Sequence, residues 1–199
     1  MYPAIYANAP VVVWLNGGPG ASSTFANFLF SSPLRIEYSN DTYDMFTTTE
    51  TWIDQATVIY IDQPVGTGFS YGEPLLTTMD EATAEFVTMM TNIMAEYPDI
   101  ASKDLYMTGE SYAGKYIPRF SWALHEAGGF NLKASLIGDP YTAPLSQRTH
   151  TYLVPEALNI IDDSNMPQIA ALQKSCQETI AVDLEAAADA CKAILNYVG

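Results

Sequence analysis

The sequence is short of positive charge and of long apolar runs. It has 8 Lys and Arg against 23 Asp and Glu in 199 residues, which gives a formal net charge of −15. Nucleic-acid binding needs basic side chains that neutralise phosphates, so this class of protein is excluded. A membrane span needs about 20 consecutive apolar residues, whereas the early run 11–15 is only as long as a strand. We therefore expect no membrane span and no nucleic-acid partner.

The chain also lacks a targeting signal and a metal-binding pattern. Residues 1–9 have neither the basic start nor the apolar stretch of a signal peptide, so the chain either begins in the cytosol or has lost its natural start. Its two His and two Cys are not spaced as metal ligands, so no metal and no other cofactor is expected. Cys176 and Cys191 could form one disulfide, and residues 40–42 (Asn-Asp-Thr), in a loop-like stretch, are an N-glycosylation sequon. These two features together are typical of secreted proteins.

Apolar residues, by contrast, are plentiful. Hydrophobic residues make up 48% of the chain, which at this length is enough for a sizeable core. Short runs rich in β-branched and aromatic residues alternate with stretches of helical period, and the runs lie at 10–15, 57–61, 104–108 and 132–138. This alternation predicts the α/β class, with a mostly parallel sheet flanked by helices. Such sheets carry their sites beyond the carboxyl ends of the strands.

Two regions have clear helical patterns. Thr78 and Glu81 form a capping-box pattern before apolar residues at helical spacing, and Pro98 closes this helix. Towards the C-terminus the strand pattern stops, and residues 169–180 and 181–198 have the spacing of amphipathic helices. The expected parts are an α/β core over residues 1–145 and a helical segment over residues 146–199.

The sharpest catalytic pattern is at residues 105–118 (LYMTGESYAGKYIP). A strand runs into GESYAG and then into a helix, which is the arrangement of a nucleophile elbow. The tight turn holds the hydroxyl of Ser111 up from the sheet, and small neighbours let the strand and the helix pass closely. At the start of the helix, the backbone N–H of Tyr112 can stabilise a developing oxyanion.

A glycine-rich turn, residues 14–23 (WLNGGPGASS), follows the first strand. Gly17 and Gly18 can present a bare backbone N–H at close range, which is how α/β-hydrolases commonly make the second donor of an oxyanion hole. The other interpretation is an ordinary Gly-Pro turn. A phosphate-binding loop is not favoured, because the Lys-Ser/Thr end and the G-x-G-x-x-G spacing are missing.

Three motifs in order, WLNGGPGASS (14–23), IDQPVGTGFSYG (61–72) and GESYAG (109–114), closely resemble the serine carboxypeptidase family. The likeness covers residues 11–145 approximately and is weaker in the helical remainder. It implies an α/β-hydrolase with a helical insertion, or cap, of which this chain holds the nucleophile-bearing part as an incomplete domain. It also implies an acid-active serine peptidase of the vacuole, the lysosome or the extracellular space, which releases single residues from the C-termini of peptides or proteins.

The resemblance also assigns roles to residues. They are the nucleophile Ser111, the oxyanion-hole N–H groups of Gly18 and Tyr112, and the carboxylate-binding residues Asn16 and Glu110, helped by Trp14. A Glu beside a bound carboxylate shares one proton with it, which is why the arrangement works best at acidic pH.

The chain departs from the family pattern downstream of the elbow. The Asp and His of the family's triad lie in motifs that have no counterpart before Gly199, so this chain alone is expected to be inactive. The family's usual Cys after the GGPG turn is Ala21, and its usual Gly-Asn after the fourth strand is Gly138-Asp139. One usual disulfide is therefore not expected.

An in-chain triad is an alternative that the sequence leaves open. Ser111, Asp139 and His150 have the chain order of a hydrolase triad. His125, on the helix that follows the elbow, is interpreted as a surface or interhelix histidine.

Two further functions are compatible with the same motifs. The chain could be an inactive homologue that binds C-terminal carboxylates or a partner, or an acyltransferase or esterase that uses Ser111 with another acceptor. The sequence leaves open the residue preference at the scissile bond and the oligomeric state.

Overall fold

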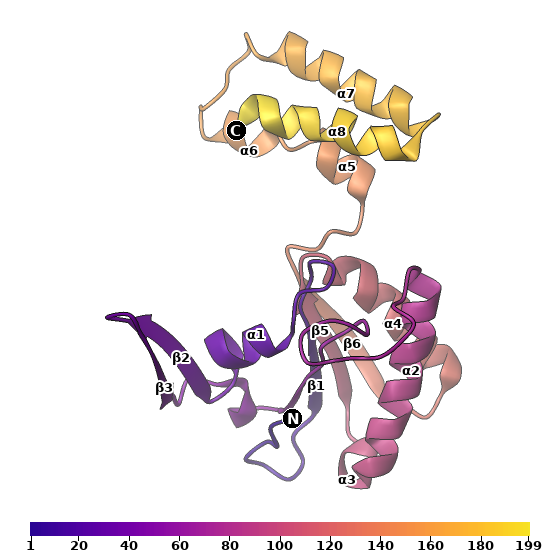
Figure 1. Cartoon of the computed structure of the whole chain (residues 1–199). Coiled ribbons are helices and arrows are strands. Elements are labelled where there is room, and N and C mark those ends of the chain that lie inside the picture. Colours follow the sequence, from indigo (N-terminus) through magenta and orange to yellow (C-terminus); the bar gives the residue numbers. More distant parts are fainter. The chain divides into compact units, whose positions relative to one another are not determined.

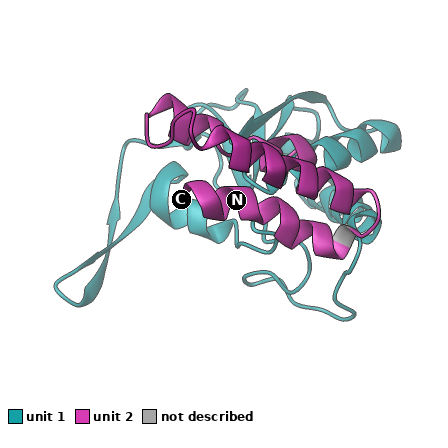
Figure 2. Ribbon diagram, turned by 90° about the horizontal axis from the view of Figure 1, so that it is seen from above, with its two compact units in different colours: residues 1–141 teal, residues 142–199 magenta. Residues whose placement is uncertain are grey.

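In the computed structural model the chain divides into two units, residues 1–141 and 142–199 (Figure 2). The structure describes residues 1–183 and 185–199 in full and residue 184 by its backbone alone. Each unit has its own core of buried hydrophobic residues. The interpretation of the second unit as a cap stays a prediction.

Strands and helices alternate through the first unit (Figure 1). The strands are β1 (Val11–Leu15), β2 (Leu34–Ser39), β3 (Thr42–Thr47), β4 (Thr57–Tyr60), β5 (Leu105–Glu110) and β6 (Leu132–Gly138). The helical segments are α1 (Thr24–Ala26), η1 (Asn27–Ser31), η2 (Trp52–Asp54), α2 (Met79–Glu96), α3 (Pro98–Ala101) and α4 (Ala113–Ala127).

The main sheet is parallel and has the strand order β4-β1-β5-β6. All four strands that the sequence predicts are in it, and each neighbouring pair is parallel, with Leu15 of β1 opposite Gly109 of β5. The predicted α/β class, with a mostly parallel sheet, is confirmed. The carboxyl ends of β1 and β5 thus meet at one edge, where the two glycine-bearing motifs begin.

One face of this sheet forms the core with α2 and α4. Alternate residues of β1, Val11, Val13 and Leu15, are fully buried and pack with Phe86 of α2 and Phe120 of α4, whose rings stack at 4.2 Å. The period of two places these three side chains on the same face. The burial of these side chains fixes which face of the sheet packs against α2 and α4.

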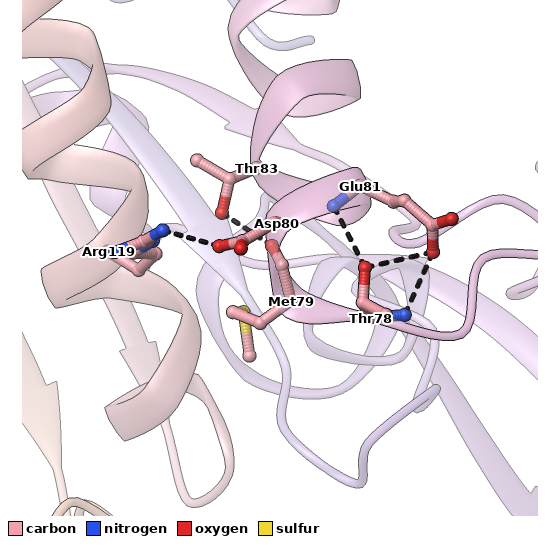
Figure 3. Close-up of polar contacts among 6 residues, drawn as sticks. All are labelled: Thr78, Met79, Asp80, Glu81, Thr83 and Arg119. Atoms are coloured by element: carbon pink, nitrogen blue, oxygen red, sulfur yellow. Dashed lines mark hydrogen bonds and ion pairs between the residues drawn. The ribbon is translucent and has the colours of Figure 1, made fainter.

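The N-terminus of α2 has the predicted capping box (Figure 3). The backbone N–H of Glu81 donates to the Thr78 hydroxyl at 3.2 Å, and the Thr78 N–H donates to the Glu81 carboxylate at 2.9 Å. Asp80, in the same turn, forms an ion pair with Arg119 of α4. The prediction that Pro98 closes this helix holds for α2, and Pro98 itself then begins α3.

The loop-like stretch expected around residues 40–42 has a turn at Asn40 and Asp41, but the sequence did not predict the strands on either side of it. This stretch is the turn of an antiparallel hairpin formed by β2 and β3. Asn40 and Asp41 have positive φ angles of 50° and 60°, as in the two-residue turns that suit the strand twist. The signal is weak in the sequence because Asn-Asp is a less distinctive turn pair than Asn-Gly.

The second unit consists of helices only. They are α5 (Pro144–Thr149), α6 (Leu153–Ala157), α7 (Met166–Ile180) and α8 (Leu184–Val198). Its core is small, with Ile161, Ile169, Ile194 and Val198 as its buried members. The disulfide that the sequence allows is formed between Cys176 of α7 and Cys191 of α8. None of the helices formed by the described residues has the length and apolarity that crossing a bilayer requires.

This disulfide is expected to contribute much of the stability of the second unit. It links residues 15 positions apart. Closing a loop of this length lowers the entropy of the unfolded chain, which stabilises the folded state by about 3 kcal/mol. Replacing both Cys176 and Cys191 by Ala should lower the free energy of unfolding by about that amount, measured by urea denaturation. Gln177→Ala, an exposed change on the same helix, is the control. Equal midpoints for the double variant and the control would contradict this expectation.

Candidate active site

The elbow brings Ser111 into an unusual backbone conformation. Ser111 lies between β5 and α4 with a φ of 58°, a left-handed angle that non-glycine residues adopt rarely and mostly at special sites. Its N–H donates to the carbonyl of Gly138 at 3.0 Å, and its carbonyl accepts from the N–H of Tyr141 at 2.8 Å. Its side chain stays exposed. The end of β6 therefore holds the turn from both sides and leaves the hydroxyl accessible.

The glycine-rich turn after β1 packs directly against this elbow. A Cβ on Gly17 would lie 2.5 Å from the nitrogen of Tyr112 and 2.8 Å from the Cβ of Ser111. Gly18, the next residue, has a φ of +109°, which a glycine adopts without strain. The structure thus brings the loop of Gly18 and the helix start at Tyr112 together beside Ser111, as an oxyanion hole requires.

Three of the predicted residues are linked by hydrogen bonds between their side chains. The indole N–H of Trp14 donates to Oδ1 of Asn16 at 2.7 Å, and Nδ2 of Asn16 donates to Oε1 of Glu110 at 3.3 Å. Trp14 and Asn16 are 8% and 5% exposed. Because Trp14 occupies the amide oxygen of Asn16, the amide N–H groups are the ones turned towards Glu110. Trp14 thereby orients Asn16.

The motif at residues 61–72 holds the glycine-rich turn in place through Asp62. This carboxylate accepts from the Ser22 hydroxyl at 2.7 Å, from the N–H of Thr24 at 3.1 Å and from the N–H of Phe69 at 3.0 Å. Burial raises the pKa of Asp62, but the hydrogen bonds from Phe69, Ser22 and Thr24 together outweigh it and hold that pKa below the usual value. The sequence reasoning did not single out Asp62, although a carboxylate just beyond the end of β4 is where such sheets carry their sites.

A second anchor comes from α4. Tyr116 is 3% exposed, and its phenol has a hydrogen bond with the backbone of Gly20. Burial, and to a lesser degree the neighbouring Tyr112, raises the pKa of Tyr116 to about 12. The phenol is therefore neutral over the whole physiological range and remains a fixed partner of the glycine-rich turn. The sequence analysis did not single out Tyr116 either, because in the sequence it is only one of several apolar residues of the helix.

The structure places the three remaining sequence candidates in different surroundings. Asp139 is exposed, has a φ of 40°, and lies between the two residues that bond the backbone of Ser111. His150 is in the second unit, where its Nδ1 is 2.7 Å from the carbonyl of Ser146. His125 is near the end of α4 and exposed, and its ring is tilted against that of Trp122, with the centroids 6.0 Å apart. The triad of Ser111, Asp139 and His150 stays a prediction.

The Asp62 network should give the protein a pH-dependent stability. The pKa of an Asp in the unfolded chain is about 4, and that of Asp62 in the folded protein is lower. The ionised Asp62 therefore stabilises the protein fully above the unfolded pKa, and this stabilisation is lost as the pH falls through the folded pKa. Asp62→Asn is therefore expected to lower the free energy of unfolding by about 2 kcal/mol at neutral pH, with a difference that shrinks in acid. Urea denaturation at several pH values measures it.

The control is Asp44→Asn, which removes an exposed carboxylate of β3. A loss of stability in Asp62→Asn that does not change with pH would show that the charge of Asp62 plays no part.

The parallel sheet, the elbow and the glycine-rich turn beside it define the class of protein, an α/β-hydrolase. Within this class, the family model described as serine carboxypeptidase matches residues 4–198. The chain therefore belongs to the serine carboxypeptidase family, and the resemblance seen in its three motifs is confirmed.

Known proteins similar to this chain are carboxypeptidases. Carboxypeptidase Y homolog A of Trichophyton verrucosum is 39% identical over 142 residues, which are 70% of this chain and 26% of that protein. Carboxypeptidase Y homolog A of Aspergillus clavatus is 34% identical over 186 residues, which are 86% of this chain and 34% of that protein. The crystal structure of Kex1(delta)p, a prohormone-processing carboxypeptidase from Saccharomyces cerevisiae, superposes with a TM-score of 0.82 at 28% identity, over 96% of this chain and 44% of that one. The chain thus spans about a quarter to a third of the length of these curated relatives.

Proposed function

We propose that this chain carries the nucleophile and the carboxylate-binding site of a serine-type carboxypeptidase that acts on peptide C-termini. The observation that carries the proposal is the series of side-chain hydrogen bonds from Trp14 through Asn16 to Glu110. Glu110 precedes Ser111 in the sequence, and both lie at the same edge of the sheet. An amide donor and a carboxyl group beside a nucleophile match a substrate whose free carboxylate is one residue away from the scissile bond.

The chemistry follows from these positions. The Ser111 oxygen attacks the carbonyl of the last peptide bond, the N–H groups of Gly18 and Tyr112 stabilise the oxyanion, and the C-terminal residue leaves as an acyl-enzyme forms. The proton of Ser111 needs a base. In this proposal the base is the family's His, oriented by its Asp, both supplied by polypeptide outside these 199 residues, and the chain alone turns over peptides poorly.

The proposed carboxylate site also predicts an acidic working range. A substrate carboxylate beside Glu110 brings two like charges together, so one proton is taken up when the substrate binds. Working at low pH suits a vacuolar, lysosomal or extracellular enzyme. A route through the secretory pathway also agrees with the disulfide between Cys176 and Cys191.

Proton uptake makes the proposal testable by binding alone. The affinity of a peptide with a free C-terminus should weaken by up to about tenfold for each unit by which the pH rises, because binding takes up one proton. In Glu110→Gln this dependence should disappear, because the neutral amide does not repel the substrate carboxylate and no proton has to be taken up on binding. Titration calorimetry between about pH 4 and pH 7 measures both slopes.

Two controls accompany this experiment. The same peptide with an amidated C-terminus should bind weakly at every pH, and Glu126→Gln, at the exposed end of α4, should keep the wild-type slope. If the wild type and Glu110→Gln have the same pH dependence, Glu110 does not bind the carboxylate.

A further inference from the structure

The hairpin of β2 and β3 has one apolar and one polar face. Its register pairs Leu34 with Thr47, Ile36 with Met45, and Tyr38 with Tyr43. Cross-strand pairs at every second position share a face, so these side chains form a single surface. The intervening pairs, Arg35 with Phe46, Glu37 with Asp44 and Ser39 with Thr42, form the other, more polar face.

The polar face is the one tied to the rest of the first unit. The guanidinium of Arg35 donates to the carbonyls of Phe30 and Glu50, both at 2.8 Å. The outer part of the apolar face is left in solvent. Tyr38, Tyr43 and Met45 are 59%, 77% and 65% exposed. Contiguous exposed apolar side chains of this size generally indicate a surface that something covers.

The turn of this hairpin contains the only Asn-x-Ser/Thr sequence in the chain, at residues 40–42. Tyr38 and Tyr43 are the second cross-strand pair from the turn, after Ser39 and Thr42, and their ring centroids are 4.8 Å apart. The Tyr38 hydroxyl donates to the Asp41 carboxylate at 3.0 Å, which holds this ring against the turn. An acceptor asparagine and a pair of exposed rings thus lie within three positions of each other along the chain.

We propose that Asn40 is an N-glycosylation site and that its first sugars pack over the rings of Tyr38 and Tyr43. The inference rests on the secretory route of the proposed function but not on the carboxypeptidase chemistry. The donor is a lipid-pyrophosphate-linked oligosaccharide. Nδ2 of Asn40 bonds to its anomeric carbon and loses one proton, the bond from that carbon to the pyrophosphate oxygen breaks, and the lipid pyrophosphate leaves.

The rings are suited to a sugar. The faces of an aromatic ring carry partial negative charge, and the C–H groups on one side of a sugar ring carry partial positive charge. Tyrosine combines such a face with a hydroxyl that stays hydrated. A glycan would therefore cover the apolar tip and leave a polar surface outside.

The first experiment asks whether Asn40 is modified. The chain is secreted from yeast, and the peptide that contains Asn40 is weighed before and after treatment with peptide-N-glycosidase, which converts a glycosylated asparagine into aspartate. The wild type should carry a glycan, whereas Asn40→Gln and Thr42→Ala should carry none. Ser39→Ala, in the same turn, should keep it. The Thr42→Ala variant retains Asn40 and its turn, so the result does not depend on how Gln tolerates a positive φ.

The second experiment asks whether the glycan packs on the rings. Enzymatic removal of the glycan should lower the Tm of the wild type. In a Tyr38→Ala, Tyr43→Ala variant the same removal should leave the Tm unchanged. A decrease of equal size in both proteins would overturn the packing.

A secreted chain with its disulfide formed and Asn40 unmodified would overturn the site itself. In that case the disulfide shows that the chain has passed through the oxidising lumen, so this inference fails while the carboxypeptidase chemistry of the proposed function is unaffected. The reverse case would be a glycosylated Asn40 together with the same pH dependence of peptide binding in the wild type and Glu110→Gln, since Asn40 takes no part in that binding.

Discussion

Ser111→Ala is expected to abolish reaction with a fluorophosphonate probe and to lower peptide turnover by at least about 10⁴-fold. The alanine has no oxygen with which to form an acyl-enzyme, whereas the backbone bonds to Gly138 and Tyr141 that hold the elbow remain. The measurement is probe labelling and release of C-terminal residues by the protein expressed in its natural source, with the isolated 199-residue chain assayed beside it. Peptide affinity should change little, because the carboxylate site is intact.

The control for this experiment is Ser121→Ala on α4, which removes a serine hydroxyl that contacts only Ser135 among the polar contacts described. Peptide binding with no labelling of the wild type would favour the inactive binding module instead. Rapid turnover of activated esters with weak release of C-terminal residues would favour the acyltransferase or esterase. The three functions that the motifs allow are thus separated by one set of assays.

Gly109→Ala should be among the most destabilising single changes in the first unit. A Cβ at this position would lie 2.2 Å from the carbonyl oxygen of Leu15 and 2.8 Å from the Cβ of Ala113. One neighbour is the backbone of the paired strand β1 and the other is the first residue of α4, so neither can move without displacing the elbow. We expect a loss of about 3 kcal/mol or more in the free energy of unfolding, measured by urea denaturation.

Gly138→Ala is the matched control. It is also a glycine at the end of a strand, but the nearest atom to its added Cβ is 3.9 Å away. Similar unfolding midpoints for the two variants would show that the close approach of β1, β5 and α4 is not what requires Gly109.

The catalytic edge could be predicted from sequence because its signals are local. Three strands of the main sheet, β1, β4 and β5, have largely buried runs, whereas β6 is mostly exposed. The elbow and the glycine-rich turn each place their special residues within a few positions of a strand end. Trp14, Asn16 and Glu110 were assigned through the family resemblance, and the structure brings them into contact.

The parts that were missed depend on contacts between distant segments. Asp62 bonds to Ser22, 40 positions away, and although it lies just beyond the end of β4, no local pattern identifies its partners. Tyr116 has the helical period of a core residue, and only the folded chain shows that its phenol meets Gly20. The hairpin was missed because its apolar positions are mixed with charged ones and remain largely exposed, so its strands lack the buried run that identifies β1, β4 and β5.

The separation of Asn16 and Glu110 along the chain has a consequence for how the site forms during folding. They lie 94 positions apart, and the contact exists only once β5 has paired with β1. Closing so long a loop costs entropy before any contact compensates for it, which is the reason that folds of this topology acquire their native pairings slowly. The contact between Asn16 and Glu110, which we propose binds the substrate carboxylate, is therefore formed late in folding. The indole of Trp14, hydrogen-bonded to Asn16, is a fluorophore beside that contact.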